Sequence, residues 1–156
     1  MKTEAEIVGL SKNKLLAAEV LLQNGCYDDA YYLSGYSLEL LLKARICKTL
    51  LIPDFFDFEN AKKRRLNISK TRRSEGENLY KPFKVHDYEQ LIILSGLYVE
   101  FSKKLADLAD LGFSADWSIV SNWDENLRYS NGSSKADVES FIASIKNINT
   151  WLTQFL

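Results

Sequence analysis

The chain has 156 residues, of which 46% are hydrophobic and 26% charged, and its formal net charge is −1. This length and composition are typical of one soluble globular domain and exclude an intrinsically disordered chain. The near-zero net charge also excludes a protein that coats nucleic acid with its whole surface. The two cysteines, Cys26 and Cys47, are too few for a disulfide framework, so we expect free thiols.

No apolar run approaches the roughly 20 residues that a membrane-spanning helix needs. The first residues, Met1 to Glu6, carry acids where a signal peptide would have a basic region followed by an apolar one. We therefore expect a cytoplasmic protein that does not associate with membranes.

The first helix is predicted to begin after Thr3, because Glu6 stands three residues later in a capping-box spacing. It is predicted to end at Asn24-Gly25, since glycine readily adopts the left-handed conformation of a helix C-terminus. Its apolar residues fall on one stripe at helical spacing, namely Ile7, Leu10, Leu15, Ala18, Leu21 and Leu22.

The second helix is predicted to begin at Asp28 or Asp29 and to run to about Leu51, before Pro53. It is apolar on nearly all sides, which predicts a helix buried in the middle of the domain. A run of small residues in this helix, Ser34, Gly35 and Ser37, is expected to let a neighbouring helix approach closely.

Residues 53–86 form a long connection, and such connections are usually functional or disordered. Its basic stretch, which ends near Pro82, has few apolar residues. Asp54 to Phe58 is expected to open a short helix that attaches its aromatic rings to the core. We expect a mobile basic insertion at about residues 60–84. Seven cations and no acid lie in its central part: Lys62, Lys63, Arg64, Arg65, Lys70, Arg72 and Arg73.

Three further helices complete the predicted order. The third begins at His86-Asp87, with Asp87 as cap, and closes at Gly112. A shorter fourth runs from Ser114 or Ala115 to Tyr129, and the last runs from Ser134 to near Phe155. No segment alternates with the period of a strand. The sequence therefore predicts a single all-α domain over residues 1–156, an antiparallel up-and-down bundle of four long helices plus one short helix.

Several motifs make the chain resemble HEPN domains (higher eukaryotes and prokaryotes nucleotide-binding). The second helix opens with Gly25-x-Tyr27-x-x-Ala30 and closes with Glu39-x-x-x-Lys43-Ala44, and the later matches are His86 to Leu91 and Trp123 followed by Arg128-Tyr129. The resemblance implies a helical bundle, frequent homodimerisation, and a role in toxin–antitoxin or defence systems beside a small nucleotidyltransferase partner protein.

Many HEPN ribonucleases carry an arginine followed after four to six residues by a histidine. The arginine stabilises the charged phosphorane and the histidine moves protons, without a metal. Arg128 matches the arginine by its context, but the residues from Tyr129 to Lys135 contain no histidine. The resemblance therefore implies a binding role for Arg128, and a salt bridge to Glu39 or Asp124 is the alternative.

His86 is the one imidazole of the chain, so any histidine-based proton transfer must use it; otherwise it stands at a helix start beside the cap Asp87. Glu39 and Lys43 are spaced four apart on a buried helix, which predicts an internal ion pair or a polar face lining a cleft. One histidine and two scattered cysteines predict no metal site. No glycine-rich phosphate loop is present, and we expect no cofactor.

The favoured function is a non-catalytic module that binds RNA or a nucleotide through Arg128, Lys43, Glu39 and the seven cations of the insertion. The basic run is alternatively only a solvated loop. Two other functions stay open. One is a metal-independent endoribonuclease that uses Arg128 and His86, and the other is a structural domain whose basic loop docks an acidic protein.

Overall fold

A computed structural model of the chain describes residues 3–57, 81–129 and 131–156, and only the backbone of Lys81 and Arg128. These ranges contain helices and no strand, which confirms the all-α class. The elements are α1 (Glu4–Gln23), α2 (Tyr27–Leu50), η2 (Lys81–Phe83), α5 (Tyr88–Leu94), α6 (Tyr98–Leu105), α7 (Leu111–Val120), η3 (Glu125–Tyr129) and α8 (Lys135–Thr153). None of the helices in these ranges has the length and apolarity to cross a membrane.

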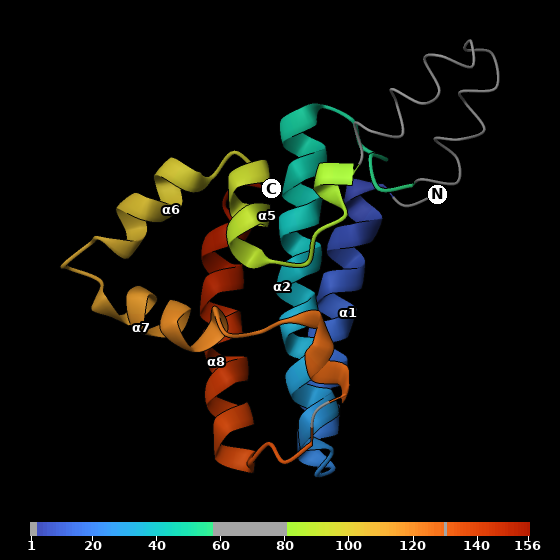
Figure 1. Cartoon of the computed structure of the whole chain (residues 1–156), viewed down its shortest axis with the longest axis vertical. Helices are drawn as coiled ribbons and strands as arrows, with labels where there is room; N and C mark the ends of the chain where they lie inside the picture. Colours follow the sequence, from blue (N-terminus) through green and yellow to red (C-terminus); the bar gives the residue numbers. More distant parts are fainter. Residues whose placement is uncertain (1–2, 58–80, 130) are drawn as a thin grey trace.

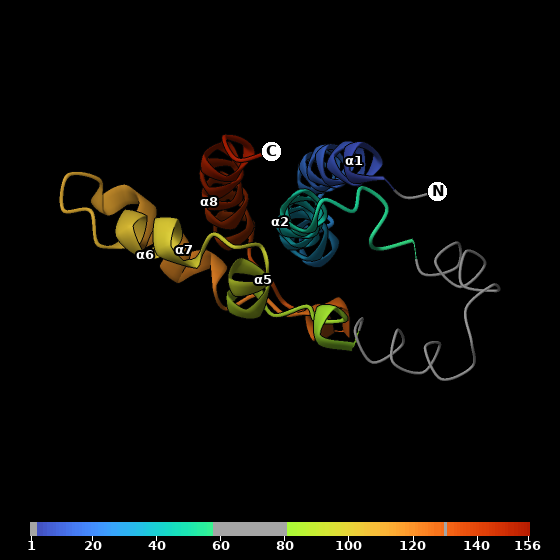
Figure 2. The same ribbon diagram turned by 90° about the horizontal axis from the view of Figure 1, so that it is seen from above.

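Helix α2 is the centre of the fold. It contacts α1, α8, α5 and η3, and Figure 2 shows it enclosed by these elements. Its buried residues lie on every side of the helix, from Ala30 to Cys47, as the all-round apolar sequence predicted. Figure 1 shows α1, α2 and α8 as three long neighbouring helices, with α2 and α8 running in the same direction. Helices α6 and α7 extend away from them on one side.

The predicted limits of the first helix and the predicted end of the second are confirmed, and α2 begins at Tyr27, one residue before the predicted Asp28. Thr3 and Glu6 form the expected capping box, with the amide of Thr3 donating to Oε2 of Glu6 at 2.7 Å. Gly25 follows α1 with φ of 78°. Helix α2 ends at Leu50, and Leu51 takes a left-handed conformation. Pro53 follows two residues later and cannot continue a helix.

The predicted third long helix is wrong, because the chain breaks after α5. In a continuous helix the carbonyl of Ser95 would accept the amide of Val99, but here it accepts the hydroxyl of Thr49 on α2 at 2.6 Å. Gly96 follows with φ of 75°, a conformation that glycine adopts without steric cost. A side chain on α2 and a glycine together replace one long helix by the short helices α5 and α6.

The predicted fourth helix also differs in its limits. Asp110 caps α7, accepting from the amide of Phe113 at 3.3 Å, so the helix begins at Leu111 and Gly112 lies inside it. It ends at Val120 instead of Tyr129, and the chain reaches η3 through a turn that buries Trp123. The last helix is confirmed, with Ser134 as its cap.

The small residues of α2 serve two different contacts. The carbonyl of Ser37 accepts from the Ser11 hydroxyl of α1 at 2.7 Å. The hydroxyl of Ser37 accepts from Nδ2 of Asn149 on α8 at 3.4 Å. This is the predicted close approach of helices. Gly35 instead lies against the ring of Trp123, where a Cβ atom would be 2.3 Å from the indole.

The segment after α2 forms turns and not the expected short helix, although it does attach an aromatic ring to the core. Phe55 is buried and meets Phe83 of η2 edge-on, with ring centroids 4.7 Å apart. The basic insertion expected at about 60–84 falls mostly on residues 58–80, which lie outside the described residues, as do Lys62 to Arg73.

We expect Gly35→Ala to lower the free energy of unfolding by about 1–3 kcal/mol, since the added methyl group overpacks the Trp123 contact. The matched control is Gly9→Ala in α1, where a Cβ atom would meet nothing within 4 Å. That variant should be neutral or gain up to about 1 kcal/mol from helix propensity. Urea unfolding measures both, and equal effects of the two substitutions would contradict the packing argument.

The loop before α8 is tied to the start of α2 by Asp28, whose carboxylate accepts from the amides of Gly132 and Ser133 at 3.3 and 2.9 Å. Hydrogen bonds from Ser133, and then from Gly132, hold the pKa of Asp28 below its usual range. A lowered folded-state pKa contributes stability above the unfolded value of about 4, and that contribution disappears as the pH falls through the folded value.

Wild type should therefore exceed Asp28→Asn in stability near neutral pH, and the difference should shrink below about pH 4. Thermal unfolding between pH 3 and pH 7 measures this difference. Asp29→Asn is the control, because it removes a charge from the same helix turn without removing the acceptor of these two amides. A difference from wild type that does not change with pH would show that Asp28 acts through shape alone.

Candidate functional site

The centre of the candidate site is Glu39, a carboxylate in the middle of α2. Its side chain is 1% exposed, so it must be paired with donors. One turn later on the same helix, Nζ of Lys43 lies 2.5 Å from Oε1 of Glu39. The i, i+4 spacing thus produces the predicted internal ion pair.

A second donor reaches Glu39 from a distant part of the chain. Nδ1 of His86 lies 3.0 and 3.1 Å from the two carboxylate oxygens of Glu39. The adjacent Asp87 is the cap of α5, accepting from the amide of Gln90 at 2.8 Å. His86 therefore does stand just before the helix, as expected, but its ring also binds the buried carboxylate.

The other ring nitrogen of His86 meets a second glutamate. Nε2 lies 2.9 Å from Oε2 of Glu125, the first residue of η3. The imidazole bridges α2 and η3.

The four side chains form a gradient from the core to the surface. Glu39 is 1% exposed, Lys43 15%, Glu125 37% and His86 43%. We call these four residues the His86 cluster. Its inner carboxylate is sealed from water, and its outer carboxylate and imidazole are open to ligands.

An aromatic contact positions the two segments that supply His86 and Glu125. The Tyr88 hydroxyl donates to the carbonyl of Gly35 at 2.7 Å, which fixes the start of α5 on α2. The ring of Tyr88 stacks on Trp123 with centroids 5.1 Å apart, and Trp123 lies two residues before Glu125. Gly35 contacts both aromatic residues, so the geometry of the cluster depends on it.

The charge of Glu39 affects neighbouring tyrosines. Burial, and then the negative charge of Glu39, raises the pKa of Tyr88 well above its usual value. The same two causes raise the pKa of Tyr36. Both phenols therefore stay protonated at physiological pH and can act only as neutral hydrogen-bonding groups.

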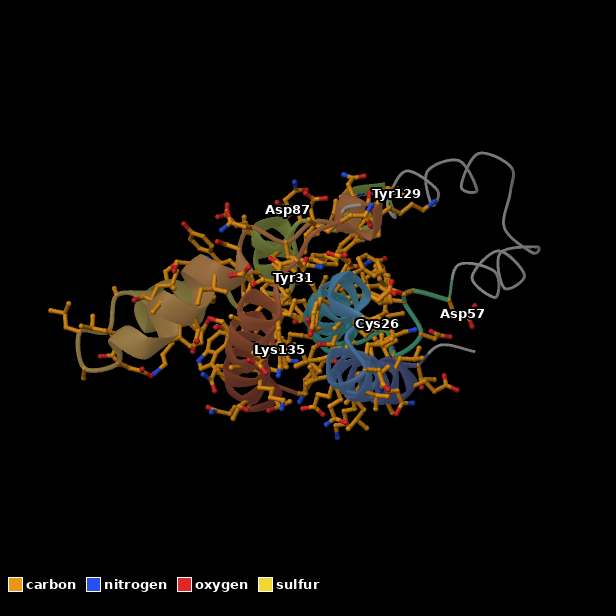
Figure 3. The ribbon with its side chains drawn as sticks, turned by 90° about the horizontal axis from the view of Figure 1, so that it is seen from below. Cys26, Tyr31, Asp57, Asp87, Tyr129 and Lys135 are labelled. Carbon is orange, nitrogen blue, oxygen red and sulfur yellow. The ribbon has the colours of Figure 1, made fainter. Side chains whose placement is uncertain are left out.

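The predicted site residues are brought together in part. Glu39, Lys43 and His86 meet in one cluster, although they come from separate predictions. The backbone of Arg128 lies in η3, three residues after Glu125, and its side chain is outside the described part. Asp124, a partner considered for Arg128, accepts from the amide of Asn126 at 2.6 Å. Figure 3 places Asp87 and Tyr129, the neighbours of His86 and Arg128, along one edge of the molecule.

Sequence reasoning missed Glu125. It lies on a turn between two helices, at no recognisable spacing from His86, so no sequence pattern indicates the contact. The pairing of His86 with Glu39 had an indirect signal, because a buried carboxylate needs donors and the chain has one imidazole.

Across the three described ranges, no three histidine, cysteine, aspartate or glutamate side chains are arranged to hold a metal ion. The 2.9–3.1 Å contacts of His86 are hydrogen-bond distances. The two cysteines are free, with Cys26 exposed and Cys47 buried.

A scan against models of known protein families found no match, and searches of curated proteins and of solved structures found none either.

We expect the two glutamates of the cluster to contribute unequally to stability. Glu39→Gln should cost about 2 kcal/mol, because a buried hydrogen-bonded charge is replaced by an amide that cannot accept from both Lys43 and His86 equally well. Glu125→Gln should cost less than about 1 kcal/mol, since its contact is at the surface. Chemical denaturation measures both, and a larger loss for Glu125→Gln would contradict the gradient.

Proposed function

We propose that this protein is a HEPN-like helical module that binds RNA or a nucleotide through phosphate contacts at the exposed side of the His86 cluster. The observation that supports this most is the position of the imidazole. His86 is held from inside by Glu39 and stands at the surface beside η3, the turn that carries Arg128. Arginine, lysine and imidazolium groups are the usual partners of phosphate oxygens.

The attachment of the basic segment is a second line of support. Nζ of Lys43 lies 5.8 Å from the ring centroid of Phe56, just before the described chain stops at Asp57, which Figure 3 labels. Phe83, just after the chain resumes, lies near the same place because its ring meets Phe55. Phe56 and Phe83, which flank the sequence that carries the seven cations, therefore both lie on the Lys43 side of the cluster.

The module is non-catalytic in this function, because no histidine stands among the residues from Tyr129 to Lys135 that follow Arg128. By its HEPN resemblance, we also propose that the protein is a cytoplasmic homodimer that acts in a toxin–antitoxin or defence system with a nucleotidyltransferase partner. A nucleotidyltransferase gene beside this one would favour that role.

One observation favours a second candidate, a metal-independent endoribonuclease. Glu39 holds Nδ1 of His86, and, within the described residues, the outer nitrogen Nε2 is bound only by the half-exposed Glu125. An imidazole whose inner nitrogen is held by a carboxylate can transfer a proton at its outer nitrogen. His86 would then replace the histidine missing after Arg128, with Arg128 stabilising the phosphorane.

Fluorescence anisotropy of labelled single-stranded RNA tests the proposal. We expect saturable binding at low salt that weakens as salt rises, with a slope of about 0.7 in log K against log salt for each phosphate contact. Neutralising Lys62, Lys63, Arg64 and Arg65 to glutamine should lower that slope by up to about 3. Arg128→Ala should weaken binding about tenfold through loss of a charge-assisted hydrogen bond.

The control replaces four cations elsewhere by glutamine and should leave the slope near that of wild type: Lys12, Lys14, Lys103 and Lys135. Gel analysis of the same samples in EDTA distinguishes the two candidates. Intact RNA supports the binding module, whereas cleavage that is lost in Arg128→Ala and His86→Gln supports the ribonuclease. Absence of any binding at low salt would reject both and leave a domain that docks an acidic protein.

A further inference from the structure

The outer carboxylate of the His86 cluster occupies a position that suits an anionic ligand. We propose that Nε2 of His86 is a binding position for a phosphate group, and that Glu125 is a competitor within the chain that fills it in the free protein. This inference rests on the proposed function and identifies the residue that limits binding at that site.

The two carboxylate contacts of His86 differ in how easily they can be replaced. Glu39 is 1% exposed and holds Nδ1 with both oxygens while it also pairs with Lys43. Glu125 is 37% exposed and holds Nε2 with one oxygen at 2.9 Å. Exposed ion pairs contribute little to stability, so an external anion can exchange with Glu125 but not with Glu39.

The turn that carries Glu125 is held by other residues. Trp123 packs between Tyr32 and Tyr88, with ring centroids 5.9 and 5.1 Å from its own, and it fixes the start of the turn. The carboxylate of Asp124 accepts from the amide of Asn126 within the turn. Rotation of the Glu125 side chain therefore exposes Nε2 without unfolding η3.

A phosphate oxygen accepts the same hydrogen bond from Nε2 as the carboxylate does. Both are charge-assisted acceptors, so the two groups compete for one donor. While Glu125 stays in place, its negative charge also repels an approaching phosphate at short range. Removal of this charge should strengthen phosphate binding through both effects.

Proton NMR of the imidazole tests the proposal directly. The chain contains one histidine, so its ring resonances report on this site alone. We would titrate inorganic phosphate into wild type, Glu125→Gln and Glu125→Ala at constant pH, with sodium chloride keeping the ionic strength constant. We expect the chemical shifts of the His86 ring protons to change saturably with phosphate. The phosphate affinity should be about fivefold higher in Glu125→Gln than in wild type, and that of Glu125→Ala should be at least as high as that of Glu125→Gln.

Glu139→Gln on α8 is the matched control, because it removes one carboxylate charge from a surface ion pair with Lys135. Its phosphate affinity should equal that of wild type. Equal affinity of wild type and both Glu125 variants would overturn the proposal, and so would shifts no larger than those caused by chloride. Loss of the fold in both variants would also overturn it, since Glu125 would then be structural and not exchangeable.

RNA anisotropy separates failure of this inference from failure of the proposed function. If wild type binds RNA but phosphate does not perturb His86, RNA binds elsewhere and only the inference fails. If phosphate shifts the His86 resonances and Glu125→Gln raises the affinity for phosphate, but RNA does not bind, the anion site is supported and the proposed function fails.

Discussion

The burial of Glu39 is the constraint on which the candidate site depends. A carboxylate enclosed in a core helix is tolerated only when donors satisfy it, and here Lys43 and His86 do so. Lys43 lies four residues after Glu39 on the same helix, so this contact needs no distant segment of the chain. His86 comes from 47 residues further along the chain, so satisfying Glu39 brings the segment before α5 onto α2. A buried charge thereby fixes the position of an exposed imidazole.

The aromatic contacts around Gly35 give this arrangement its rigidity. Tyr88 and Trp123 come from the two segments that supply His86 and Glu125, and both contact Gly35. A larger residue at position 35 would displace the indole, and with it the turn that carries Glu125. Packing in the centre of α2 and polar geometry at the surface are therefore coupled, and a substitution without any charge change can alter the site.

The sequence predicted those features of the fold that are determined by residues close together in the chain. The capping box of α1, the burial of α2, the start of the last helix near Ser134 and the Glu39–Lys43 pair are confirmed because each rests on residues within a few positions. The break between α5 and α6 was not predicted, since it depends on the Thr49 hydroxyl as well as on Gly96. The contact between His86 and Glu125 was missed for the same reason, because it joins two elements at no recognisable spacing.

The gradient of exposure within the His86 cluster allows one imidazole to be held rigidly and still reach a ligand. If both glutamates were buried, the ring would be a structural bridge without access to solvent. If both glutamates were exposed, the imidazole would populate several rotamers, and ordering it on binding would lower the affinity for a ligand. With Glu39 inside and Glu125 outside, the ring is oriented before a ligand arrives, and only the outer contact must be exchanged. In the proposed phosphate site, the affinity would then depend mainly on how firmly Glu125 holds Nε2.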